Sequence, residues 1–257
     1  DPALVGRPCV AENVLADGGE VGFEHAGGYG EYLVTEARHV QSLPGGFALT
    51  AAPLIEPLAV CVRALRRLRV EDAGPALVFG DGPIGLLMTM LLRRNGVKDI
   101  VLVGGRADRL RAGREAGAVE TVNYHEARGD LAGAIRATGI GSFTNIVEAT
   151  GSAPALAACF ALGAPKGHVL LVGDYAKARL EAPFQTVLHH ELELIGSNAS
   201  AGAWPEAVRL AVSGEIRLDR LVTRVFPAAD YEAAFALVRD RHASAIKVVV
   251  GWCVACR

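Results

Sequence analysis

A glycine-rich segment near the middle of the chain constrains its fold more than any other feature. Segment 80–85, with the sequence GDGPIG, follows an apolar run at 75–80 and opens a helical pattern at 83–95. In a strand–turn–helix unit, Gly80 permits the tight turn, Gly82 lets a phosphate approach the backbone, and Gly85 lets the helix pack closely on the strand. The helix N-terminus would offer free N–H groups to an anion. The segment predicts a dinucleotide site, with a purely structural turn as the alternative.

The end of the next apolar run indicates which dinucleotide is preferred. The run 101–103 ends in Gly104, Gly105 and Arg106. NAD-binding folds place an acid here to hold the ribose 2′-hydroxyl, whereas a glycine leaves room for a 2′-phosphate and a guanidinium can pair with it. The sequence therefore favours NADP over NAD. The alternative is that Arg106 only begins the next helix in solvent.

Apolar runs alternate with helical patterns from residue 57 onward, which predicts an α/β fold with a doubly wound parallel sheet. Pro57 suits the first position of a helix that continues over 58–68. Further helices are expected at 83–95, 106–117, 125–137, 153–163, 203–213 and 231–238. Strands are expected at 8–14, 30–34, 40–42, 75–80, 99–104, 119–122, 143–148, 168–173, 191–197, 221–226 and 246–250.

Composition limits the partners of the protein. A chain of 257 residues with 51% hydrophobic residues can form one large or two modest domains. Its net charge of −2 gives no basic surface for nucleic acid or for an anionic membrane. The longest apolar run, 84–92, is too short to span a bilayer, and no signal peptide is apparent. We expect a cytoplasmic protein.

The five cysteines do not indicate a disulfide framework, because their number is odd and they are dispersed. Cys253 and Cys256 form a CxxC pair at the C-terminus. A redox or metal role would need a helix N-terminus or a second ligand pair beside them, and the sequence indicates neither. We expect the pair to belong to an ordinary tail.

Several motifs together resemble one enzyme family. Segments 28–34 (GYGEYLV), 55–60 (IEPLAV), 80–85, 147–151 (VEATG) and 245–249 (AIKVV) occur in the order and at the spacing of that family. The chain resembles the medium-chain dehydrogenase/reductases, in the branch of sorbitol and threonine dehydrogenases, over essentially its whole length. The resemblance implies a Rossmann domain at 58–214 with strand order 3-2-1-4-5-6. It also implies a mostly β, GroES-like catalytic domain made of 1–57 and 215–257.

The resemblance also implies which residues lie along the cofactor. Segments 148–151 and 172–174 would lie at strand ends beside it, and Lys247 matches a basic position that can reach the pyrophosphate. A solvated lysine is the alternative for Lys247. The candidate cofactor-binding residues are Gly80, Gly82, Pro83, Ile84, Gly85, Gly104, Gly105, Arg106, Arg109, Ala149, Thr150, Val172, Gly173, Asp174 and Lys247.

The zinc chemistry of that branch is represented by one residue. Glu56 matches the acid of the family's Glu-Pro position and is the candidate catalytic and metal-binding residue. Its alternative role is to stabilise the start of a helix. The family's Cys-Gly and Gly-His-Glu ligands and its four-cysteine zinc lobe are not in the sequence, and one carboxylate does not make a zinc site. Either the protein lacks these parts or this sequence leaves them out. The start at Asp1 favours the second, so Zn²⁺ is expected only in the intact protein.

These features predict an NADP-preferring oxidoreductase that transfers hydride between the nicotinamide and a secondary alcohol, a polyol or the ketone. A zinc-independent reductase of an activated double bond and a nucleotide-binding protein without catalysis are the alternatives. The small-molecule substrate is not specified by the sequence. An apolar strand at 192–197 is expected at a sheet edge, where unpaired backbone groups invite association. We therefore expect a homodimer or homotetramer.

Overall fold

The computed structural model describes residues 17–70, 73–176, 179, 184–240 and 243–252. The chain divides into two compact units. The outer unit comprises Asp1–Arg63 and Ala199–Arg257, and the central unit comprises Ala64–Asn198. The sequence placed boundaries after residues 57 and 214 instead. That the outer segments form a catalytic domain stays a prediction.

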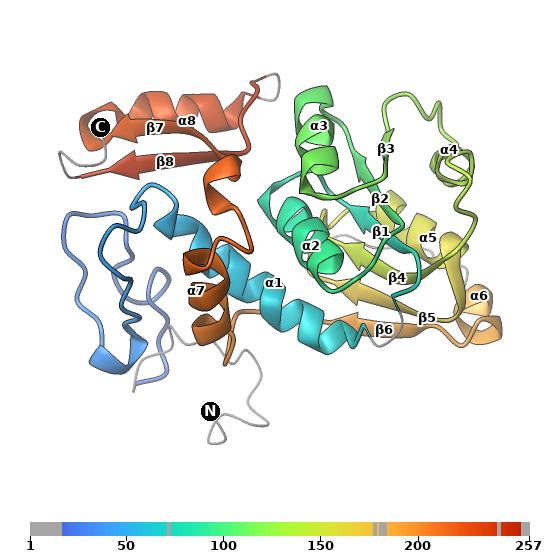
Figure 1. Ribbon diagram of the computed structural model, residues 1–257, viewed down its shortest axis with the longest axis horizontal. Coiled ribbons are helices and arrows are strands. Elements are labelled where there is room, and N and C mark those ends of the chain that lie inside the picture. The colour runs from blue at the N-terminus through green and yellow to red at the C-terminus, as the bar shows by residue number, and fades with distance from the viewer. Residues whose placement is uncertain (1–16, 71–72, 177–178, 180–183, 241–242, 253–257) are drawn as a thin grey trace. The chain divides into compact units, whose positions relative to one another are not determined.

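The central unit is built on a parallel sheet of six strands (Figure 1). The strand order is β3-β2-β1-β4-β5-β6, which is the predicted order 3-2-1-4-5-6 and confirms the doubly wound fold class. The strands are β1 (Ala76–Phe79), β2 (Ile100–Gly104), β3 (Glu120–Asn123), β4 (Phe143–Glu148), β5 (Gly163–Leu171) and β6 (Glu193–Gly196). As predicted, β6 lies at the sheet edge.

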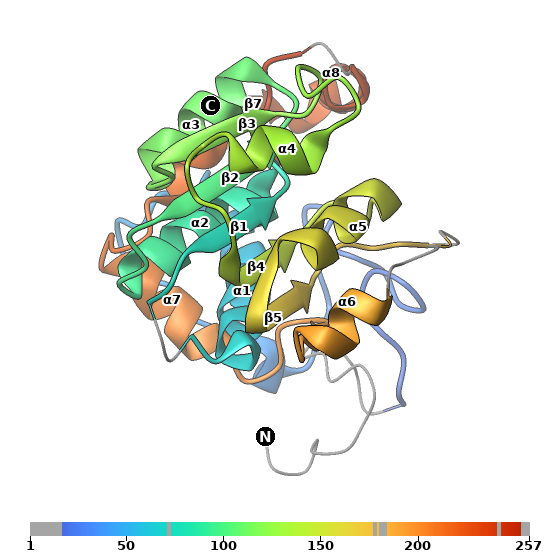
Figure 2. The ribbon, with the colours of Figure 1, turned by 90° about the vertical axis from the view of Figure 1, so that its right-hand side faces the viewer.

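Helices lie on both faces of this sheet (Figure 2). Helices α2 (Pro83–Arg94) and α3 (Ala107–Ala116) are on one face, and α4 (Leu131–Arg136) and α5 (Ala153–Leu162) are on the other. Their ends follow local rules. Pro83 occupies the first turn of α2, and Gly117 ends α3 in the left-handed conformation. The short α6 (Phe184–His189) was not predicted.

The core explains why the strands are apolar along their whole length. All residues of β1 and β2 are buried, as expected for central strands covered on both faces. Because side chains alternate along a strand, Leu77 and Phe79 share one face, where they pack with Phe143 and Ile146 of β4 and with α5. This packing holds the strands in a fixed register.

The outer unit contains a smaller parallel pair of strands (Figure 1). Strands β7 (Val222–Pro227) and β8 (Lys247–Gly251) are connected through α8 (Tyr231–Arg239). Helix α1 (Ile55–Leu68) begins in this unit and continues into the central one.

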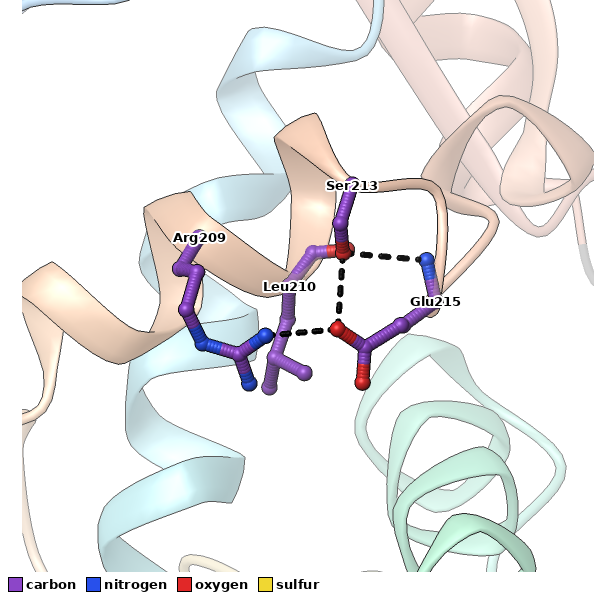
Figure 3. A network of polar contacts seen from close by, with 4 residues as sticks. All are labelled: Arg209, Leu210, Ser213 and Glu215. Carbon is purple, nitrogen blue, oxygen red and sulfur yellow. Dashed lines mark hydrogen bonds and ion pairs between the residues drawn. The ribbon is translucent and has the colours of Figure 1, made fainter.

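Helix α7 (Trp204–Val212) of the outer unit ends in a polar network (Figure 3). Ser213 Oγ donates to the Leu210 carbonyl and lies 3.0 Å from Glu215 Oε1, which also accepts a 2.5 Å bond from Arg209 Nη1. The network gives the last turn of the helix partners for groups that the helix leaves unpaired.

Three expectations for the outer unit need correction or lie outside the structure. Strands at 30–34 and 40–42 are absent, and the described residues of 17–70 contain isolated bridge residues, among them the pair Val21 and His25, but no strand. Their alternating pattern was not sufficient, because an extended segment needs a partner strand for its backbone groups. The expected strand at 8–14 lies outside the described residues.

Several element boundaries also differ from the prediction, and α4 begins at Leu131 instead of residue 125. Helix α1 begins at Ile55, so Pro57 lies inside its first turn, where it costs no intrahelical hydrogen bond. Strand β5 begins at Gly163, earlier than the apolar run that predicted it.

No helix in the described part of the chain is long and apolar enough to cross a membrane.

Candidate functional site

The register of the sheet places four strand ends side by side. Phe79, the last residue of β1, pairs with Val103 of β2 and with Glu148 of β4, and Glu148 pairs with Leu171 of β5. The predicted residues of the central unit follow directly after these positions, or lie on the helices that begin there. Ligands of doubly wound folds bind outside the carboxyl ends of the strands, where the strand order reverses. Here that reversal lies between β1 and β4.

The glycine segment forms a turn in which two glycines are required by the protein itself. Gly80 has a φ of +117°, and a Cβ on it would lie 3.3 Å from the Ala149 carbonyl oxygen. A Cβ on Gly85 would lie only 1.7 Å from the carbonyl oxygen of Gly80. With a side chain at either position, β1 and helix α2 could not lie as close together as they do.

Gly82 is different, because nothing in the protein requires it to lack a side chain. It is the N-cap of α2 with an ordinary extended conformation (φ −82°, ψ −179°), and a Cβ on it would meet no atom within 4 Å. Pro83 and Ile84 follow it in the first turn. The space over Gly82 and the N-terminus of α2 can therefore accept a phosphate.

A buried carboxylate fixes the loop after β4. Glu148 is fully buried, and its Oε1 accepts hydrogen bonds from the Thr150 N–H (2.9 Å) and the Thr150 hydroxyl. Its Oε2 accepts from the Gly151 N–H (3.0 Å) and the Tyr175 hydroxyl (2.5 Å). Burial, followed by this hydrogen bond to Glu148, raises the pKa of Tyr175, so the phenol stays a proton donor. The network holds Ala149 and Thr150 in place beside Gly80.

The loops after β4 and β5 touch backbone to backbone. A Cβ on Gly151 (φ +68°) would lie 2.0 Å from the Asp174 carbonyl oxygen, and one on Gly173 would lie 2.2 Å from the Gly151 nitrogen. Val172 continues the ladder by donating its N–H to the Glu148 carbonyl. The predicted residues Thr150, Gly173 and Asp174 thereby lie together at the carboxyl ends of β4 and β5.

Asp81, which the sequence did not mark as a site residue, lies at the end of β2. Asp81 Oδ2 accepts hydrogen bonds from the backbone N–H groups of Gly105 (2.9 Å) and Arg106 (3.0 Å). A Cβ on Gly104 would lie 2.5 Å from Asp81 Cβ and Oδ2. The side chain of Asp81 therefore takes the space that a Cβ at position 104 would need, and room for a 2′-phosphate beside Gly104 stays a prediction.

Two arginines add positive charge beside Asp81. Arg109 Nη1 lies 3.7 Å from Asp81 Oδ1, and both side chains are largely buried. Burial and the neighbouring charge of Arg106 lower the pKa of Arg109, while Asp81 and Asp108 act in the opposite direction. The positive charges of Arg106 and Arg109 together favour an anion at this strand end.

Two predicted residues, Glu56 and Lys247, belong to the outer unit. Glu56 lies in the first turn of α1, and Lys247 is the first residue of β8. Loss of hydration raises the pKa of Glu56, and the positive charge of Lys247 opposes this rise. The charge of Lys247 therefore acts on Glu56 within the outer unit.

The described residues do not fit a zinc ion. Among them no group of three histidine, cysteine, aspartate or glutamate side chains could hold a metal. Cys61 and Cys159 are buried, and burial raises the pKa of both thiols, which disfavours the thiolate that metals bind. The CxxC pair Cys253 and Cys256 lies outside the described part of the chain.

Comparison with known proteins gives a consistent result. The family described as the glucose dehydrogenase C-terminus matches residues 50–252. D-altritol 5-dehydrogenase of Agrobacterium fabrum is 32% identical over 80% of this chain and 60% of its own length. L-arabinitol 4-dehydrogenase of Aureobasidium melanogenum is 31% identical over 80% of this chain and 57% of its own. The chain spans 57% to 66% of the first curated relatives that it matches.

Solved structures share the fold. A protein of Escherichia coli CFT073 named as a short-chain alcohol dehydrogenase, in complex with NADH, superposes with a TM-score of 0.84 at 24% identity, over 91% of this chain and 68% of its own. A zinc-binding dehydrogenase of Sinorhizobium meliloti bound to NADP superposes with a TM-score of 0.83 at 24% identity, over 90% of this chain and 68% of its own.

Replacing Gly82 by serine should separate ligand binding from folding. Serine is a favourable N-cap residue, and the position has space for it, so we expect unchanged or slightly higher stability in urea unfolding. We expect the affinity for NAD(P)H, measured by fluorescence titration, to fall on the order of tenfold, because the side chain fills the phosphate space. The matched variant Gly85→Ala should instead lose about 3 kcal/mol or more of stability. Wild-type affinity in Gly82→Ser would contradict the placement of the pyrophosphate.

The variant Glu148→Gln tests the loop network. An amide turns an N–H₂ group toward donors that now bind a carboxylate, so at least one buried donor loses its acceptor. We expect a loss of about 2 kcal/mol or more in the free energy of unfolding. Tyr175→Phe, which removes one donor, should cost less. The exposed Glu115→Gln on α3 should stay within about 0.5 kcal/mol of wild type. A loss in Glu148→Gln no larger than in that control would show that the network does not hold the loop.

Proposed function

Because the chain belongs to the glucose dehydrogenase C-terminus family, and with it to the polyol branch of the medium-chain dehydrogenase/reductases, we propose that it transfers hydride between a nicotinamide dinucleotide and a secondary alcohol of a polyol or its ketone. The observation that carries the proposal is the space over Gly82 at the N-terminus of α2, beside strand ends held in register. The names of the relatives, D-altritol and L-arabinitol dehydrogenases, support a polyol as the substrate class.

Each group of residues has a distinct proposed task. The bound nicotinamide accepts or donates the hydride. Gly82 and the first turn of α2 bind the pyrophosphate, and Glu148 holds the loop of Ala149 and Thr150 along the cofactor. The loop of Val172, Gly173 and Asp174 lines the next position, since its backbone is packed on that of Gly151. Lys247 is proposed to contribute a positive charge toward the pyrophosphate.

We propose a preference for NADP(H) that rests on charge at the end of β2. Gly104 and Gly105 carry no acid there, and the positive charge of Arg106 contributes to the lowered pKa of Arg109. A 2′-phosphate would relieve this repulsion and form charge-assisted hydrogen bonds. Asp81 acts against this preference, so the discrimination between the two cofactors is expected to be small in the wild-type protein.

We propose no step through zinc, because the described residues do not form a zinc site. Glu56 is proposed to lie near the reacting alcohol as part of a catalytic domain made by 1–57 and 215–257. Glu56 is an exposed residue in the first turn of α1, and partial loss of hydration still raises its pKa. A metal in the reaction would need ligands in addition to the residues described.

A dehydrogenase assay tests the proposed activity directly. Verified protein is incubated with NADP⁺ or NAD⁺ and a panel of pentitols, hexitols and simple secondary alcohols, with and without added Zn²⁺, and reduced cofactor is followed at its near-ultraviolet absorbance. Oxidation of polyols supports the proposal. Binding of NADPH without turnover on any alcohol or ketone would favour a nucleotide-binding protein. Turnover only on activated double bonds would favour a reductase.

The variant Arg106→Ala should lose affinity for NADP(H) selectively. Removing one charge-assisted partner of the 2′-phosphate should weaken NADPH binding by about tenfold and leave NADH binding within about twofold. Arg111→Ala, which removes an exposed arginine of the same helix, is the control and should change neither. Equal losses for both cofactors, or a wild-type preference for NAD(H), would contradict the role of Arg106.

We also propose a homodimer formed through the edge strand β6. Leu194 on this strand is 42% exposed, and an apolar strand edge offers unpaired backbone groups to a second chain. Light scattering of wild-type protein should give the mass of a dimer or of a tetramer. Leu194→Lys should lower the mass toward that of a monomer, whereas Val119→Lys, equally exposed before the opposite edge strand, should not. A monomeric wild type at micromolar concentration would refute this proposal.

A further inference from the structure

Asp81 holds a fixed negative charge at the end of β2, although it belongs to the loop after β1. Its Oδ2 accepts from the backbone N–H groups of Gly105 (2.9 Å) and Arg106 (3.0 Å), and its side chain is only 14% exposed. A carboxylate with two backbone donors and little solvent is held in one position rather than moving freely. Its location is therefore a property of the folded site.

The groups that bind Asp81 are those that would bind a cofactor phosphate at this place. The Gly105 and Arg106 amides directly precede helix α3, whose N-terminus favours an anion. Arg109 Nη1, 3.7 Å from Asp81 Oδ1, adds a full positive charge. Asp81 thus already serves as the anion for two amides and one guanidinium.

Asp81 also explains the glycine at position 104. A side chain there would begin 2.5 Å from Asp81 Cβ, so Asp81 and any residue larger than glycine at 104 exclude each other. The strand end still has an acid, but the acid arrives from the neighbouring loop instead of from β2 itself. The absence of an acid at 104 therefore does not make this end of the sheet free of negative charge.

We propose that Asp81 is a specificity-determining residue that competes with the 2′-phosphate of NADP for the Gly105 and Arg106 amides and for Arg109. This inference rests on the proposed cofactor role of the strand end. A phosphate monoester carries between one and two negative charges near neutral pH and is repelled by a carboxylate held beside it. The uncharged 2′-hydroxyl of NAD can instead donate a hydrogen bond to Asp81. Asp81 thus limits the advantage that Arg106 and Arg109 give to NADP.

The test compares two probes that differ only in the 2′-phosphate, adenosine 2′,5′-bisphosphate and adenosine 5′-monophosphate. Their Kd values are measured by calorimetry on the full 257-residue chain, for wild type and for Asp81→Asn, which keeps the shape and an acceptor oxygen while removing the charge. We expect Asp81→Asn to bind the bisphosphate about tenfold more tightly or better, and the monophosphate within about threefold of wild type. Asp81→Ser, a second neutral variant, should shift the two Kd values in the same direction.

The control is Asp99→Asn, which removes one negative charge from an exposed position before the start of β2, at the opposite end of the strand. It should leave the ratio of the two Kd values unchanged. If the wild-type protein binds both probes and both Asp81 variants leave the ratio of the two Kd values unchanged, the inference is overturned and the proposed function stays intact. Equal weakening of both probes would also overturn it, because Asp81 would then only support the turn. If the wild-type protein binds none of the two probes, NADH and NADPH, the proposed function fails and the inference fails with it.

Discussion

The shared register of β1, β2, β4 and β5 is the constraint on which the rest of the site depends. Because Phe79 pairs with both Val103 and Glu148, the loops that follow these strands must emerge side by side. The apolar packing of Leu77, Phe143 and their neighbours fixes this register, since a slip by one residue would turn the core side chains to the other face. Residues separated by more than ninety positions, such as Gly80 and Gly173, therefore lie together at the carboxyl ends of the strands.

Two carboxylates connect the loops at the carboxyl ends of the strands, one on each side of β1. Glu148 joins the loops after β4 and β5 through Thr150, Gly151 and Tyr175, and Asp81 joins the loop after β1 to the end of β2. Both bind backbone N–H groups, which stabilise an ionised carboxylate more strongly than solvent-exposed partners do. The loops beside the proposed cofactor are therefore held by specific charges, whereas the turn at 80–85 depends on the absence of side chains at Gly80 and Gly85.

The residues that could be predicted are those whose role follows from local geometry. The glycine spacing, the apolar runs and the helix patterns determine the doubly wound sheet, and the structure agrees with them closely at β1, β2, β4 and α2. The expected strands at 30–34 and 40–42 failed because an extended pattern does not reveal whether a partner strand exists. Helix α6 and the early start of β5 were not predicted, because their residues carry no clear periodicity.

The sequence by itself determined the fold of the central unit, the position of the glycine turn at 80–85 and the strand ends beside it. It did so because strand and helix periods and the glycine requirements of a tight turn are local properties. Only the tertiary structure decided the electrostatics of the β2 end and the loop network of Glu148. Asp81 and Gly104 are separated by 23 positions along the chain, and their mutual exclusion depends on the distance between two parallel strands. The glycine that in the sequence predicted room for a 2′-phosphate lies, in the folded protein, against the side chain of an acid from another loop.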